Sequence, residues 1–175
     1  RPKQLVMATG MSGVPNVPQF PGAESFKGEQ QHSSQHPGPD AYTGKKCVIV
    51  GSNNSAHDIA AALWEHDADV TMLQRSSTHI VKSDSLMEEV LGPLYSEEAV
   101  ASGLTHDKAD LIFASIPYNV LPDFQRPAFD AIKQRDAEFY QKLEDAGFML
   151  DFGDDESGLF LKYLRRGGQW RYQAT

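Results

Sequence analysis

The chain has 175 residues, of which 40% are hydrophobic and 23% charged, which is typical of a folded domain that can bury a core. Its formal net charge of −8 argues against general nucleic-acid binding, which requires a basic face. No apolar run reaches the roughly 18 residues that a membrane-spanning helix needs. The single cysteine, Cys47, excludes a disulfide within the chain and fits a reducing compartment, so we expect a cytoplasmic protein.

The first 44 residues have little periodic structure. Residues 4–8 form a short strand-like run that leads into Thr9. Residues 11–44 are rich in Gly, Pro, Ser and Gln, and their prolines exclude a regular helix or a central strand. We therefore interpret residues 1–10 as an edge strand and residues 11–44 as a connector.

After the connector, the pattern becomes that of a βαβ unit. Residues 47–50 (Cys-Val-Ile-Val) form an apolar run typical of a strand buried on both faces of a parallel sheet. A turn rich in Gly, Ser and Asn follows at 51–55, and apolar residues then recur at helical spacing over 56–64. A second strand is predicted at 70–73. The sequence thus predicts an α/β fold, a Rossmann-like three-layer domain with a parallel sheet, over residues 45–175.

The next part of the chain is predicted to be a helical insertion over residues 82–122. Its first helix is expected to stop at Gly92-Pro93, and Ser96 and Thr105 are expected to cap two more helices.

Beyond the insertion, one longer helix is predicted, because four apolar residues would share one of its faces: Phe129, Ile132, Phe139 and Leu143. Gly147 is expected to end that helix, and residues 148–152 are expected to form a further strand.

The turn at 51–55 is the most informative segment for function. A dinucleotide site needs a strand, a sharp turn and a helix whose first N–H groups face the pyrophosphate. Gly51 and Ala56 fill the first and third positions of the G-x-G-x-x-G/A pattern. Asn53 stands at the second, where asparagine tolerates a positive φ better than most residues. An ordinary βα turn without a ligand is the alternative.

The end of the second strand bears on which dinucleotide binds. An NAD-selective site usually carries Asp or Glu there, which binds the ribose 2′-hydroxyl. This chain instead has Arg75, whose charged fork suits a 2′-phosphate, while a solvated surface arginine is the alternative. His79 is a further candidate for a phosphate contact. The predicted NADP(H) contacts are Gly51, Ser52, Asn53, Asn54, Ser55, Arg75, Ser76 and Ser77.

Two further motifs precede the turn. The pattern F-x-G-x-x-x-H-x-x-x-(Y/F) appears with Phe26, Gly28 and His32, and His36 stands in place of its final aromatic residue. The tripeptide at residues 8–10 reads Ala-Thr-Gly. With these motifs in order over residues 8–77, the chain resembles the flavin-containing monooxygenase family, including its plant YUCCA-like and fungal branches. Residues 78–165 resemble the family more loosely.

The resemblance implies an enzyme that uses FAD and NADPH. NADPH passes a hydride to FAD, oxygen forms a C4a-hydroperoxyflavin, and a small nucleophilic or carbonyl substrate is oxygenated. Residues 1–10 would be the last strand of the flavin domain, and residues 45–175 the NADP(H)-binding domain. Thr9 joins the predicted cofactor contacts.

Since the chain carries only one dinucleotide pattern, we expect FAD to bind mainly outside it. The chain alone is then expected to contain no catalytic residue and to be inactive. No metal site is predicted, and a homo-oligomer stays open.

Two other functions stay open. A Baeyer–Villiger monooxygenase shares this layout, although its motif carries additional aromatic and Trp/Pro features that residues 26–36 lack. A non-catalytic NADP-binding module would use the same turn. A disulfide reductase needs a redox cysteine pair, which one cysteine excludes within this span.

Overall fold

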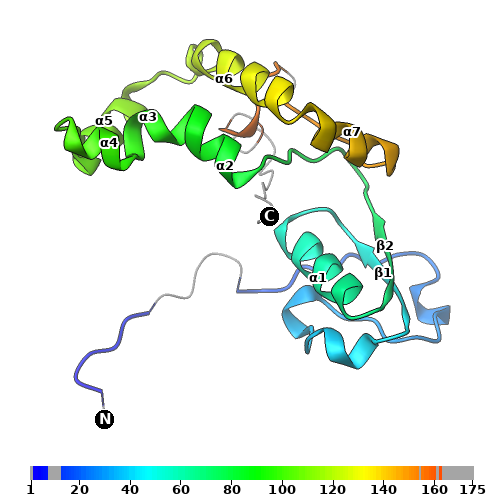
Figure 1. Cartoon of the computed structure of the whole chain (residues 1–175). Coiled ribbons are helices and arrows are strands. Elements are labelled where there is room, and N and C mark those ends of the chain that lie inside the picture. The colour runs from blue at the N-terminus through cyan, green and yellow to red at the C-terminus, as the bar shows by residue number, and fades with distance from the viewer. Residues whose placement is uncertain (1, 8–12, 154, 161, 163–175) are drawn as a thin grey trace.

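The computed structural model describes residues 2–7, 13–153, 155–160 and 162. Thr9 lies outside the described residues, so its predicted cofactor contact has no structural counterpart here. The elements, in chain order, are η1 (Ala23–Ser25), η2 (Ser33–Gln35), η3 (Pro39–Tyr42), β1 (Lys46–Val50), α1 (Asn54–Glu65), β2 (Asp69–Leu73), α2 (Ser83–Leu86), the π-helical turn η4 (Met87–Leu91), α3 (Gly92–Tyr95), α4 (Glu97–Ala101), α5 (His106–Ser115), α6 (Leu121–Arg135) and α7 (Ala137–Asp145). Figure 1 shows two groups: β1, α1 and β2 with the connector, and the helices α2 to α7.

The predicted βαβ unit is confirmed. Strands β1 and β2 pair in parallel, with Lys46 opposite Asp69 and Val50 opposite Leu73. A parallel pair needs a crossover, and α1 supplies it. This helix begins at Asn54, next to the turn where it was predicted.

The prediction that β1 is buried on both faces is wrong for the described residues. The α1 side of the sheet is covered by a small core made of Tyr42, Leu63, Ala68, Cys47, Ile49, Ile59 and Val70. On the opposite face, Val48 is 68% exposed and Val50 is 55% exposed. Side chains alternate between the faces of a strand, so the second face needs a second layer, which the described residues do not supply.

The helices enclose a larger core. Its buried members are Val81, Leu86, Phe129, Ile132, Tyr140 and Leu159. Phe129 and Ile132 lie on the same face of α6 and are fully buried. Among the described residues, no helix combines the length and the apolar character needed to cross a lipid bilayer.

The single long helix predicted for this region is wrong, because Asp136 divides it into α6 and α7. The Asp136 side chain is buried, accepts a hydrogen bond from Ser85 Oγ (2.6 Å) and pairs with Lys82 Nζ (3.1 Å). These contacts hold Asp136 at the turn between the two helices. Gly147 ends α7 with a φ of 80°, as predicted.

The predicted stop at Gly92-Pro93 is also wrong. The chain passes through the turn η4 directly into α3, and Pro93 lies in the first turn of α3, where its missing N–H costs no helical bond. A Cβ atom at Gly92 would lie 2.7 Å from the carbonyl oxygen of Met87, so this turn requires glycine. Ser96 and Thr105 cap α4 and α5 through their side-chain oxygens, as predicted.

The strand predicted at residues 148–152 is reduced to one parallel bridge, between Leu150 and Thr78. Next to it, the Gln74 side chain accepts a hydrogen bond from the Met149 N–H (2.7 Å) and donates one to the Met149 carbonyl (3.2 Å). The Gln74 amide thus takes the place of a neighbouring peptide group, and no longer ladder forms. These contacts join the βαβ unit to the end of the helical region.

Candidate cofactor-binding site

The connector motif is a packed turn attached to η3. The Phe26 ring lies so close to Gly28 that a Cβ atom there would be 2.6 Å from the ring. Gln31 Nε2 donates to the Tyr42 hydroxyl (2.6 Å), which donates to Glu29 (3.3 Å). The motif's phenylalanine and glycine therefore pack together, and its polar residues bind Tyr42 of η3, which belongs to the small core beside the sheet.

The two histidines of the motif have structural contacts. His32 Nδ1 accepts a hydrogen bond from the Ser34 N–H (3.2 Å), and the Gln35 side chain accepts one from the His32 N–H (3.4 Å). This capping box starts η2. The His36 ring stacks on Tyr42, with 5.5 Å between ring centroids and 17° between planes. His36 thus packs as a flat ring at the position where the motif has an aromatic residue.

The Gly51 turn lies where both strands end. The Gly51 N–H donates to the Leu73 carbonyl at 2.9 Å, so the turn sits beside the end of β2. Gly51 has a φ of 124°, and among the described residues no atom except those of its chain neighbours lies within 4 Å of the place where a Cβ would be. Asn53 has a φ of −93° and a ψ of −177°, so the positive φ expected there is not needed. Asparagine at this position causes no backbone strain.

The N-terminus of α1 faces outward without a side-chain cap. Asn53 is the N-cap residue, but its side chain does not accept a bond from the first turn. Asn53, Asn54 and Ser55 are exposed. The first N–H groups of a helix attract anions, and the Asn53 side chain does not compete here with an incoming phosphate.

The residues after β2 fall into two kinds. Arg75 and Ser76 are exposed, and neither side chain bonds to another residue in the described part of the chain. Ser77 Oγ, in contrast, donates to Asp151 Oδ2 at 2.5 Å. The buried hydroxyls of Ser52 and Thr78 lie 2.6 Å apart and join the two predicted phosphate-binding segments. Two of the predicted hydroxyl donors are therefore bound within the protein.

His79 is not a surface residue. It is 1% exposed, and its Nδ1 lies 2.8 Å from the Asp151 carbonyl oxygen, to which it donates. Burial lowers the pKa of His79 to about 4, so the ring is neutral near pH 7. A buried neutral ring held by a carbonyl does not reach an exposed phosphate.

Thr78, Asp151 and Lys162 belong to this site although the sequence did not point to them. Asp151 pairs with Lys162 and accepts a hydrogen bond from the Gly153 N–H (2.6 Å). Burial raises the pKa of Asp151, but the hydrogen bonds from Lys162, Ser77 and Gly153 outweigh burial and lower it. Asp151 is 74 residues from Ser77 in the chain, so no local pattern could have paired them.

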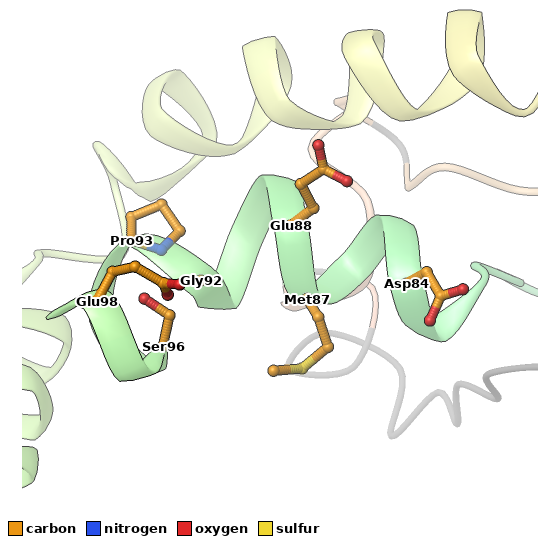
Figure 2. Close-up of a pocket in the computed structure, with 7 residues that line it drawn as sticks. All are labelled: Asp84, Met87, Glu88, Gly92, Pro93, Ser96 and Glu98. Carbon is orange, nitrogen blue, oxygen red and sulfur yellow. The ribbon is translucent and has the colours of Figure 1, made fainter. Parts of the chain in front are cut away.

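The helices carry a separate hollow, which Figure 2 shows along α2, η4 and the start of α4. Its lining residues are Asp84, Met87, Glu88, Gly92, Pro93, Ser96 and Glu98. Three carboxylates among them disfavour a phosphorylated cofactor. No group of three or more metal-binding side chains comes together within the described ranges. The Gly51 turn with Arg75 is therefore the candidate site.

Comparisons with known proteins agree with the motifs. The chain matches the pyridine nucleotide-disulphide oxidoreductase family over residues 1–117. It is 39% identical to indole-3-pyruvate monooxygenase YUCCA4 of Oryza sativa subsp. japonica over 92 residues, which are 53% of this chain and 20% of that protein. It is 35% identical to flavin-containing monooxygenase 2 of Homo sapiens over 79 residues, 44% of this chain and 15% of that protein. The chain thus spans about a fifth or less of the length of these relatives.

Proposed function

Because the chain belongs to the pyridine nucleotide-disulphide oxidoreductase family and is homologous to flavin-containing monooxygenases, we propose that it forms the NADP(H)-binding part of an FAD-dependent monooxygenase. The substrate of such an enzyme is a small nucleophilic or carbonyl compound. When bound, FAD supplies the redox chemistry with oxygen, and the NADP(H) site delivers the hydride donor.

The described residues fit the phosphates of NADP(H). The uncapped N-terminus of α1 presents its N–H groups beside the Gly51 turn, where the pyrophosphate is expected to lie. The turn has open space at Gly51, so a phosphate can approach the backbone. Asn53, Asn54 and Ser55 line its exposed side. Ser52 contributes its backbone, since its side chain binds Thr78.

The observation that carries the proposal is the exposed Arg75 at the end of β2, in place of an acid. A carboxylate there would accept a bond from a ribose 2′-hydroxyl and repel a 2′-phosphate. The Arg75 guanidinium attracts a 2′-phosphate instead. In the described part of the chain its side chain forms no bond that it would have to break in order to bind the phosphate. Ser76 is exposed beside it and adds a hydroxyl donor.

We predict that Arg75→Ala weakens NADP binding to the chain about 10- to 100-fold and leaves NAD binding nearly unchanged, because one charge-assisted hydrogen-bonded contact is worth roughly 1.5–3 kcal/mol. Isothermal titration of the parent and the variant with both cofactors measures this. Arg135→Ala is the matched control, since Arg135 pairs with Glu88 on the helical region. Equal affinity of the parent for NADP and NAD would contradict the proposal.

A second experiment tests where FAD binds. We propose that FAD binds mainly through residues outside this sequence, so the chain mixed with FAD and desalted should carry no flavin absorbance. It should also fail to oxidise NADPH with oxygen. The Arg75→Ala variant is assayed in parallel, and any NADPH oxidation that it shares with the parent does not depend on the Arg75 site. Retention of one flavin per chain would show that this division is wrong.

A further inference from the structure

The loop that carries Arg75 is fixed on both sides by one segment from beyond α7. Before Arg75, the Gln74 side chain forms two hydrogen bonds with the Met149 backbone. After Ser76, Ser77 binds the Asp151 carboxylate and His79 binds the Asp151 carbonyl. Only the side chains of Arg75 and Ser76 are left unbound between these ties in the described structure, and both are exposed. The segment 149–151 therefore determines where the exposed pair lies.

This arrangement places a negative charge at the loop. The Asp151 carboxylate is one hydrogen bond from Ser77, and its side chain is 14% exposed. A 2′-phosphate bound by Arg75 and Ser76 would lie near that carboxylate and be repelled by it. Lys162, whose side chain is 9% exposed, pairs with the same carboxylate oxygen and compensates its charge. Buried charges are poorly screened by salt, so this compensation matters for a neighbouring ligand.

We propose that Asp151 and Lys162 are a positioning and specificity pair for the 2′-phosphate: Asp151 anchors the loop through Ser77, and Lys162 cancels the repulsion that Asp151 would otherwise exert. The inference rests on the proposed NADP(H) function. Neither residue touches the cofactor: Asp151 acts through the loop, and Lys162 acts through its charge. The lowered pKa of Asp151 agrees with a carboxylate that stays charged near neutral pH.

Removing the charge of Asp151 and removing the charge of Lys162 should have opposite effects on the preference for a 2′-phosphate. Lys162→Met leaves an uncompensated carboxylate, which repels a 2′-phosphate and has little effect on a ligand with a free 2′-hydroxyl. Asp151→Asn keeps an oxygen that Ser77 can bind but leaves the Lys162 ammonium uncompensated, which attracts the phosphate. A purely structural tie would instead shift the preference for a 2′-phosphate in the same direction in both variants, or not at all.

The experiment uses the 175-residue chain with 2′,5′-ADP and 5′-AMP, two probes that differ only in the 2′-phosphate. The measured quantity is the ratio of their dissociation constants by calorimetry. We expect Lys162→Met to lower the preference for 2′,5′-ADP about fivefold and Asp151→Asn to raise it about as much, from the Coulomb energy of a unit charge at short range in a partly buried site. The double variant D151N/K162M should return to within about twofold of the parent, because both charges are then absent and no net charge acts on the phosphate.

Two further variants keep the result interpretable. Ser77→Ala removes the anchor without changing charge, so it should weaken 2′,5′-ADP, whose 2′-phosphate contacts the anchored loop, and leave 5′-AMP nearly unchanged. Lys142→Met removes a lysine that pairs with Glu138 on α7, and it should change neither binding constant. Thermal unfolding of each variant shows whether it is folded. If K162M does not fold, D151N and S77A still decide the proposal.

The possible outcomes distinguish a failure of the Asp151–Lys162 proposal from a failure of the proposed NADP(H) site. A parent that does not prefer 2′,5′-ADP overturns the proposed NADP(H) function and this inference with it. A parent that prefers 2′,5′-ADP, with D151N and K162M shifting the ratio in the same direction or not at all, overturns the pair alone. Opposite shifts that cancel in the double variant support it.

Discussion

The two regions of the molecule differ in how completely they are packed. In the helical region, Phe129 and Ile132 are fully buried. In the βαβ unit, the most buried apolar side chain is Leu63, at 3% exposure, and one face of the sheet is open in the described structure. The motifs that indicate the family lie in the less enclosed region. Residues that bind a ligand must stay accessible, whereas residues that stabilise a fold must not, so the two kinds of information lie in different parts of the chain.

The largest effect expected from this difference is on stability. We predict that Phe129→Ala lowers the free energy of unfolding by about 3–5 kcal/mol, because it empties a fully buried site. Val48→Ala on the open sheet face should change it by less than about 0.5 kcal/mol. Urea denaturation followed by fluorescence and circular dichroism measures both.

The Val48 variant also sharpens the comparison. A loss of more than about 1 kcal/mol there would mean that the sheet face is covered in solution. Repeating the denaturation at two protein concentrations would then identify a second copy as the cover, because only association makes the midpoint depend on concentration. A Phe129→Ala variant as stable as the parent would contradict the assignment of the main core.

A smaller change in unfolding free energy is expected from the titration of His79, which lies where the βαβ unit meets the helical region. Burial lowers the pKa of His79 from 6.5 to about 4, so between these values the unfolded chain binds more protons than the folded chain. The stabilisation is thus complete above pH 6.5 and is lost as the pH falls towards 4. We predict that this residue alone removes about 2 kcal/mol of unfolding free energy between pH 7 and pH 5.

The measurement is the unfolding free energy at both pH values for the parent and for His79→Asn. The variant should lose less stability on acidification, because asparagine does not titrate. His106→Asn, a change at the exposed start of α5, is the matched control and should keep the parent's dependence. Equal slopes for the parent and His79→Asn would show that His79 is not held neutral in the fold.

Local patterns were sufficient to predict β1, α1, β2 and the caps at Ser96 and Thr105. Each depends on residues a few positions apart, such as the turn glycine or the capping oxygen. The split at Asp136 could not be predicted, because its cause is a contact with Ser85, 51 residues away. The failure at Gly92-Pro93 has a local cause: a proline that ends one helix can equally lie in the first turn of the next.

The candidate site shows the same division. The positions of Gly51 and Arg75 followed from the turn pattern and from the missing acid, and they remain the centre of the proposal. The sequence could not show that Ser52 and Ser77 are bound internally, since their partners are Thr78 and Asp151. Hydroxyl groups are short-range donors, and which acceptor they meet depends on tertiary contacts.

The contact made by the Gln74 side-chain amide bears on how many residues can be inserted into the helical region or deleted from it. It binds Met149, 75 residues later, with two hydrogen bonds that need no particular path between them. The entropy of closing such a loop grows only logarithmically, so doubling the intervening stretch would cost about 0.6 kcal/mol. Because the joint at the loop is local and the helices carry their own core, inserted or deleted helical turns far from it need not disturb the position of Arg75.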